Sequence, residues 1–160
     1  MILIPKLSNF VELGGTLAIA HFDLNGQLIE NRFYSNLVVT AGKQWIASRM
    51  KDASIPTQMT HMAVGGNSNV GNNPAKTTPA VGDTTLTVQA SAPVLGELAR
   101  VALTTAGGSV SGAVVTYAAT FAAGTGTGSL IEAGIFNAAS AGTMLCKTSF
   151  DVVNKAANDS

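Results

Sequence analysis

The chain has 160 residues, enough for one domain with a hydrophobic core, and 46% of them are hydrophobic. Only 11% are charged, and the formal net charge is +0. Such a chain lacks the clustered lysines and arginines that bind phosphates, so we expect no nucleic-acid partner. Low charge also favours association between copies, which predicts a homo-oligomer.

The start of the chain and its cysteine content limit the cellular context. Cys146 is the single cysteine, so no intrachain disulfide is expected, and folding in a reducing cytosol follows. MILIPKLSNF has no basic segment before its apolar stretch, which disfavours a signal peptide. No apolar run approaches the roughly 18 residues of a membrane span, so none is expected. We assign residues 1–15 to an N-terminal arm or edge segment and 16–160 to one domain.

Two strand-like runs flank the first turn signal. TLAIAHFDL at residues 16–24 precedes Asn25-Gly26, and QLIENRFY follows it. Asn-Gly between two such runs is the strongest short hairpin signal, because both central residues of the turn need positive φ. The sequence therefore predicts a two-residue hairpin turn with left-handed backbone at Gly26.

The next segment, NLVVTAGKQWIASRMKD, predicts a short strand and then the one convincing helix. Thr40 can cap a helix near residues 41–51. Trp45, Ile46 and Met50 fall on one face of that helix, which predicts that this face packs on the core.

A long loop and several short strands complete the predicted domain. GGNSNVGNNPAKTTPAVGD, at about residues 65–83, is dense in glycine, asparagine, proline and threonine and predicts a long surface loop. Glycine-containing turns separate most of the strand-like segments beyond it, which are TTLTVQ, ELARVALTT, AVVTYAATF, SLIEAGIF and TMLCKTSFDVV. This spacing predicts an all-β fold, an antiparallel β-sandwich with one short helix near residues 41–51.

Motifs for metal binding and nucleophilic catalysis are absent from the sequence. His21, His61 and Cys146 do not stand at zinc-ligand spacings, so we predict no metal and no cofactor. GGSVSG does not match a nucleophile elbow, and Gly42-Lys43 lacks the earlier glycine of a phosphate-binding loop. Cys146, within TMLCKT, is interpreted as a small buried strand residue. These patterns do not predict an enzyme.

Glu132 is the most informative carboxylate, because it lies in the apolar stretch LIEAGIF. Side chains alternate along a strand, and both faces of this one are mainly apolar, so we expect it to be covered on both sides. A buried carboxylate needs a partner. Arg100, in GELARVAL, is the predicted partner, since arginine can donate two hydrogen bonds to one carboxylate. The alternative is an acid–base pair of Glu97 and Glu132, although nothing in the sequence positions a substrate between them.

Several segments resemble one protein family. NLVVTAGKQWIASRM is similar to an "NLVTNAGK…IA" segment of small virion structural proteins of tailed bacteriophages, and THMAVGGN resembles their "thiAVGtG". GELARVAL, VTYAATFAAGTGTGSLIEAGIFNAASAGTMLCKTSF and the closing VVNK also resemble the family pattern. The resemblance covers about residues 36–155 and implies an all-β structural module without catalytic residues. The most characteristic matches are Glu97, Arg100, Glu132, Gly134, Phe136 and Gly142.

The residues suggest reasons for these matches. A pair of Arg100 and Glu132 would lock strand register. Gly134 would admit a close backbone or aromatic ring, and Gly142 would close the last hairpin. Family members usually continue after the segment that corresponds to VVNK with another apolar strand. We therefore expect either further chain or a neighbouring subunit at that strand position.

Composition and resemblance together lead to three hypotheses about function. The first is a bacteriophage virion structural protein, assembled in the host cytoplasm, that joins other virion proteins in the tail, the tail-fibre base or the baseplate. The alternative is a capsid decoration protein on the head lattice, for which the same composition would serve. The third is a glycan hydrolase using Glu97 and Glu132. One tryptophan and two tyrosines offer few rings for sugars to stack on, which disfavours it.

Overall fold

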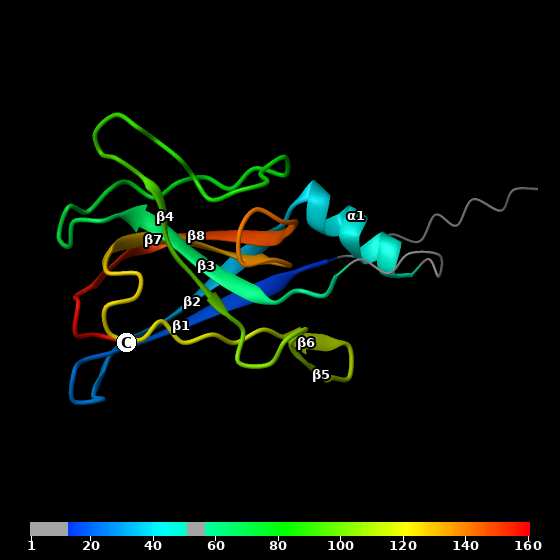
Figure 1. Ribbon diagram of the computed structural model, residues 1–160, viewed down its shortest axis with the longest axis horizontal. Coiled ribbons are helices and arrows are strands. Elements are labelled where there is room, and N and C mark those ends of the chain that lie inside the picture. Colours follow the sequence, from blue (N-terminus) through cyan, green and yellow to red (C-terminus); the bar gives the residue numbers. More distant parts are fainter. Residues whose placement is uncertain (1–12, 51–56) are drawn as a thin grey trace, which may run out of the picture.

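The computed structural model describes residues 13–50 and 57–160, so most of the predicted arm at 1–15 lies outside the described residues. Within them, strands dominate and one helix is present, which confirms the predicted all-β class with a single short helix. In chain order the elements are β1 (Gly15–Phe22), β2 (Leu28–Val38), α1 (Thr40–Arg49), β3 (His61–Asn67), β4 (Gly96–Ala102), β5 (Ser109–Ser111), β6 (Val114–Thr116), β7 (Gly128–Phe136) and β8 (Met144–Lys155) (Figure 1).

Six strands form one antiparallel sheet in the order β1-β2-β8-β7-β3-β4, and β5 and β6 form a separate hairpin. β2 joins β8 only through Leu37 and Val38, and beyond these residues the β1–β2 hairpin leaves the sheet. Tyr34 from this hairpin packs against Phe150 of β8, with ring centroids 5.8 Å apart. The hairpin therefore forms part of a second layer over the sheet, and the fold is sandwich-like.

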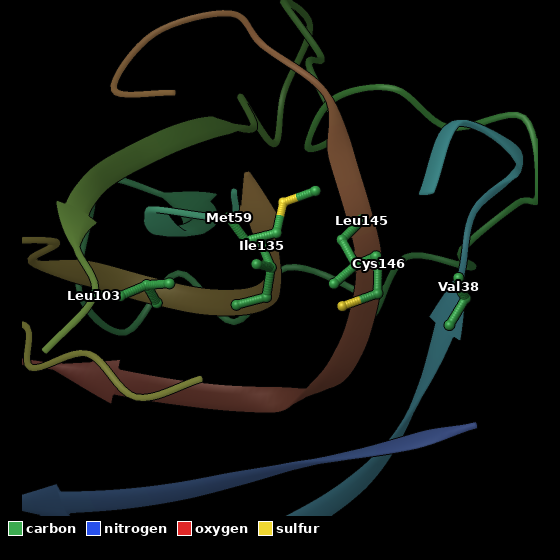
Figure 2. Packing of buried hydrophobic residues seen from close by; sticks show 6 residues of the cluster. All are labelled: Val38, Met59, Leu103, Ile135, Leu145 and Cys146. Atoms are coloured by element: carbon green, nitrogen blue, oxygen red, sulfur yellow. The ribbon is translucent and has the colours of Figure 1, made fainter. Parts of the chain in front are cut away.

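β7 is the centre of the molecule. All nine of its residues are buried, which confirms the prediction that this strand is covered on both sides. Ile135 from β7 packs with Cys146 from β8 in one apolar cluster (Figure 2). Burial raises the pKa of the Cys146 thiol to about 11, as expected for a small core residue that is not poised for chemistry. The cluster consists of Val38, Met59, Leu103, Ile135, Leu145 and Cys146.

The long connection from residue 68 to residue 95, named here the cover, lies over a second apolar cluster. Leu86 of the cover is buried with Phe136 and Met144. The backbone of the cover is tied to the helix, because the Thr40 amide donates to the Val81 carbonyl at 2.7 Å. Most residues from 68 to 83 are exposed, as predicted for a surface loop, whereas Pro74 and Leu86 are buried.

The predicted boundaries of this connection were wrong. β3 continues to Asn67, so the loop does not begin near residue 65. The segment TTLTVQ, predicted as a strand, makes only a single bridge between Gln89 and Leu95. Since Thr87 in this segment turns to a buried partner instead of a neighbouring strand, the cover continues beyond residue 83.

The helix begins one residue earlier than predicted. Val39 occupies the N-cap position and makes no side-chain capping bond, so Thr40 does not cap the helix but is its first residue. Trp45 and Ile46 pack against the core as expected. Met50, predicted on the same face, follows the last helical residue and is 85% exposed.

The β1–β2 turn differs from the prediction in one respect. Gly26 has the expected left-handed backbone, with φ of +76°, but it is the only residue of the turn with positive φ. The Gly26 amide donates to the Asp23 carbonyl at 3.0 Å, so the central residues are Leu24 and Asn25. The Asp23 carboxylate accepts from the amides of Asn25 and Gln27, both at 2.8 Å. These bonds shift the turn by one residue relative to a two-residue Asn25-Gly26 turn.

Replacing Gly26 with valine is expected to lower the free energy of unfolding by about 1–2 kcal/mol, the cost of left-handed backbone in an L-residue. A side chain here would meet nothing within 4 Å, so the cost comes from the backbone alone. The matched control is Gly26→Asn, which should lose less because asparagine tolerates positive φ. Urea denaturation measures both, and equal midpoints for the valine variant and the parent would contradict the prediction.

Candidate functional site

Glu132 lies in the middle of β7 and is 1% exposed. Its carboxylate accepts hydrogen bonds from the Thr87 amide, from the Thr87 hydroxyl at 2.8 Å and from the Thr77 hydroxyl at 3.0 Å. Gly65, directly opposite on β3, leaves room for the carboxylate, since a Cβ at that position would stand 2.9 Å from Oε1. Three donors and a neighbouring glycine therefore define the position of a fully buried acid.

Lys147 supplies the positive charge. It lies on β8, directly opposite Gly134 of β7, and its side chain is 4% exposed. The ammonium is 3.3 Å from Glu132 Oε2 and 3.2 Å from Asp83 Oδ2, and it donates to the Thr87 hydroxyl at 3.0 Å. Its three N–H groups thus face three acceptors, and two of those acceptors are carboxylates.

These side chains form one buried polar group, named here the Glu132 cluster. The Ser149 hydroxyl extends it by a 2.6 Å hydrogen bond with Thr77. Strands β7 and β8 supply part of the cluster and the cover supplies the rest, so the cluster joins the sheet to the cover. Its members are Thr77, Asp83, Thr87, Glu132, Lys147 and Ser149.

The predicted pair of Arg100 and Glu132 is wrong. Arg100 instead binds the two carboxylate oxygens of Glu97, at 2.9 and 2.7 Å. Its guanidinium stacks on Phe136, 3.7 Å from the ring centroid. The physical reason is strand order, because β3 separates β4 from β7 whereas β8 is hydrogen-bonded to β7. Glu132 therefore meets the lysine of the adjacent strand.

A β-bulge explains why Arg100 and Glu97 face the same side of the sheet. Residues three apart on a regular strand point to opposite faces. On β4, however, Ala99 pairs with Val64 while Glu97 pairs with the next residue, Gly65, so the register shifts by one. The shift brings the two side chains together, and the sequence pattern carries no direct sign of it.

Arg100 also holds the connection between β7 and β8. Its Nη1 donates to the carbonyls of Ala138 at 3.1 Å and Ala141 at 2.8 Å. Gly142 in this connection has φ of +77°, which confirms that it closes the last hairpin. The prediction for Gly134 is also confirmed, because a Cβ there would stand 3.1 Å from the Phe136 ring and 3.2 Å from the Cys146 carbonyl.

The sequence pattern did not identify the other members of the Glu132 cluster, which are Lys147, Asp83, Thr87, Thr77 and Ser149. One signal could have found Lys147, since it is the lone charge in the apolar strand segment TMLCKTSF, as Glu132 is in LIEAGIF. Two single opposite charges in successive strands of an expected hairpin are candidates for a cross-strand pair. The residues of the cover have no such pattern, because their positions follow from how an irregular segment packs.

A second polar group lies near the end of β1. His21 is 5% exposed, and its ring nitrogens lie 3.0 Å from Asp159 Oδ2 and 3.4 Å from Glu30 Oε1. A hydrogen bond from the Ala156 amide, with help from His21, lowers the pKa of Asp159. Ser160 exchanges two backbone hydrogen bonds with Phe22, so these contacts bind the last residues of the chain to β1.

In residues 13–50 and 57–160, no group of three or more histidine, cysteine, aspartate or glutamate side chains is arranged to hold a metal ion.

An apolar groove of about 120 Å³ runs beside β1. Neither Glu97 nor Glu132 lines this groove, and the near-complete burial of Glu132 keeps its carboxylate away from solvent. The lining residues are Leu17, Ala18, Ile19, Ala20, Met62, Val64, Ala119, Phe121, Leu130, Ala133, Phe150 and Val153.

Comparison with protein-family models, curated proteins and solved structures finds no match to this chain. In the described part of the chain, no helix is long and apolar enough to cross a membrane.

Proposed function

We propose that this protein is a bacteriophage virion structural protein that acts by assembly with other virion subunits, in the tail, the tail-fibre base or the baseplate. The observation that carries the proposal is the uncharged, partly apolar outer face of the β1–β2 hairpin. The sequence resemblance over about residues 36–155 supports the same role. The low charge of the whole chain agrees with a surface that neighbouring subunits cover.

The outer face of the hairpin presents large apolar side chains to solvent. Phe33 is 67% exposed and Ile29 is 55% exposed. Ala18 stands directly opposite Phe33, so the ring lies on a surface of small side chains. Exposed apolar patches of this kind mark sites of protein association. The exposed residues of this face are Thr16, Ala18, Ala20, Ile29, Asn31, Phe33 and Ser35, and none is charged.

The edge of the sheet offers a second means of association. Within the described residues, β1 pairs with β2 on one side, and its opposite edge from Gly15 to His21 has no strand partner. The apolar groove runs along this edge. An extended segment of a neighbouring subunit can add to such an edge through backbone hydrogen bonds and place apolar side chains in the groove.

Substituting Phe33 with glutamate tests the proposed assembly surface. The variant should fold, because the side chain is exposed, but it should fail to assemble, because the charge would be buried in the interface. The matched control is Val110→Glu on β5, which is 71% exposed and lies outside this face. Sedimentation at high protein concentration and mass spectrometry of purified virions measure the two outcomes. A parent protein that stays monomeric and is absent from virions would refute the proposal.

Immunogold labelling of virions tests the location. Labelling of the tail, fibre base or baseplate is the expected result. Labelling spread over the head lattice would replace the tail assignment with capsid decoration.

A further inference from the structure

We propose that Lys147 and Asp83 condense to form an intramolecular isopeptide bond, with Glu132 as the group that moves the proton. The inference rests on the geometry of the Glu132 cluster and is independent of the proposed virion role. A primary amine lies within 3.2 Å of one carboxylate and 3.3 Å of another, and its side chain is 4% exposed. One carboxylate is the electrophile, and the other is the proton carrier.

The roles of the two acids follow from their surroundings. Glu132 is held by three hydrogen-bond donors, and its side chain is 1% exposed. Asp83 belongs to the cover and its side chain is 26% exposed, so water released at its carboxyl carbon has a path to solvent. Asp83 is therefore assigned as the acid that reacts and Glu132 as the acid that remains.

The reaction balances without a co-reactant. A proton first passes from the Lys147 ammonium to the Asp83 carboxylate, which leaves a neutral amine and a carboxylic acid. The amine lone pair then attacks Cγ of Asp83 and forms the N–C bond. Glu132 takes a second proton from the nitrogen and delivers it to the departing hydroxyl, so one water leaves and the Cγ–O bond breaks. Glu132 ends in the state in which it began.

The fold favours this condensation over the same reaction in water. Holding two reacting groups in contact gives effective concentrations of about 10⁵–10⁸ M in well-oriented cases. The Thr87 amide and hydroxyl hold Glu132 beside the ammonium, and they remain available after the amide has formed.

The bond would fasten the cover to β8. The cover otherwise depends on packing and hydrogen bonds to stay on the sheet. A covalent link between Asp83 and Lys147 would keep it closed even when these contacts loosen, because it restricts the unfolded chain as well as the folded one.

Intact-mass spectrometry of the denatured full-length protein tests the proposal. After incubation of the folded protein at neutral pH, the mass should be lower than the sequence mass by one water. Protease digestion should yield a branched peptide that joins the segments around Asp83 and Lys147. This branched peptide distinguishes the isopeptide from a cyclic imide at one aspartate, which joins no second segment. A folded parent at its full sequence mass would overturn the proposal.

Three variants assign the roles. Asp83→Ala should keep the full sequence mass, because the electrophile is gone. Glu132→Gln keeps the shape of the side chain but cannot take the proton, so it should also keep the full mass or lose water at least tenfold more slowly. The matched control is Lys76→Arg, at an exposed pair with Asp151, and it should lose water as the parent does. Loss of water in the Asp83 variant, or an unchanged rate in the Glu132 variant, would refute the assigned residue.

Discussion

Replacing Lys147 with methionine is expected to lower the free energy of unfolding by about 3–5 kcal/mol, the usual cost of removing one partner from a buried ion pair. Lys147 is the cation for both Glu132 and Asp83, and without it two carboxylates face one another across the cluster. Glu132 is 1% exposed and has no access to solvent that would compensate the loss. Urea denaturation followed by circular dichroism measures the effect.

A second substitution tests whether the lost stability comes from the unpaired buried charge of Glu132. The double variant Lys147→Met with Glu132→Gln removes the buried charge of Glu132 while keeping an acceptor for Thr87. The charge that remains, on Asp83, has a side chain 26% exposed, so the double variant should recover much of the loss. Both variants lack the amide proposed above, and the difference between them therefore reports the buried charge alone. Lys76→Met is the control, since this lysine is exposed and its pairing is worth less than about 1 kcal/mol. A double variant no more stable than the single one would contradict the charge explanation.

Substitution of Gly42 with alanine is expected to destabilise the protein by about 3 kcal/mol, at the upper end of the range for overpacked cores. In an isolated helix the same change stabilises by roughly 1 kcal/mol, so the sign of the effect is diagnostic. Gly42 lies in α1 where the helix meets β8, and a Cβ there would stand 2.0 Å from the Leu145 carbonyl oxygen. Because the obstacle is backbone, the helix has to move off the sheet.

The control for this substitution is Gly82→Ala in the cover. A Cβ at Gly82 meets nothing within 4 Å, so the variant should unfold at nearly the parent midpoint. Thermal melts of the two variants beside the parent provide the measurement. A Gly42 variant that is more stable than the parent would show that the helix does not contact β8 as closely as described.

The position of Arg100 connects three parts of the fold. It binds Glu97 on its own strand, covers the Phe136 ring and holds two carbonyls of the β7–β8 connection. These contacts position the edge strand β4 against the end of the central hairpin. The Glu132 cluster does the same for the cover. The contacts of Arg100 and the Glu132 cluster thus each mark a place where separate elements are joined.

The amino-acid sequence by itself determined the elements whose signals are local. The apolar residues on both faces of LIEAGIF predicted β7 as a strand covered on both sides, and the apolar face around Trp45 predicted the packing of the helix on the core. Gly26 and Gly142 were predicted correctly because a tight turn constrains the backbone of the residue that forms it. These features depend on a few neighbouring residues, so a pattern in the chain is enough to reveal them.

Tertiary structure alone decided which charges meet. The pairing of Glu132 with Lys147 follows from the strand order, and the pairing of Arg100 with Glu97 follows from a bulge that shifts register by one residue. The roles of Thr77, Asp83 and Thr87 depend on how the cover packs over Phe136 and Met144. A buried charge requires a partner, and this much can be read from the sequence. Which partner it finds depends on contacts between residues far apart in the chain, and the energies of those contacts are set only when the sheet and its cover come together.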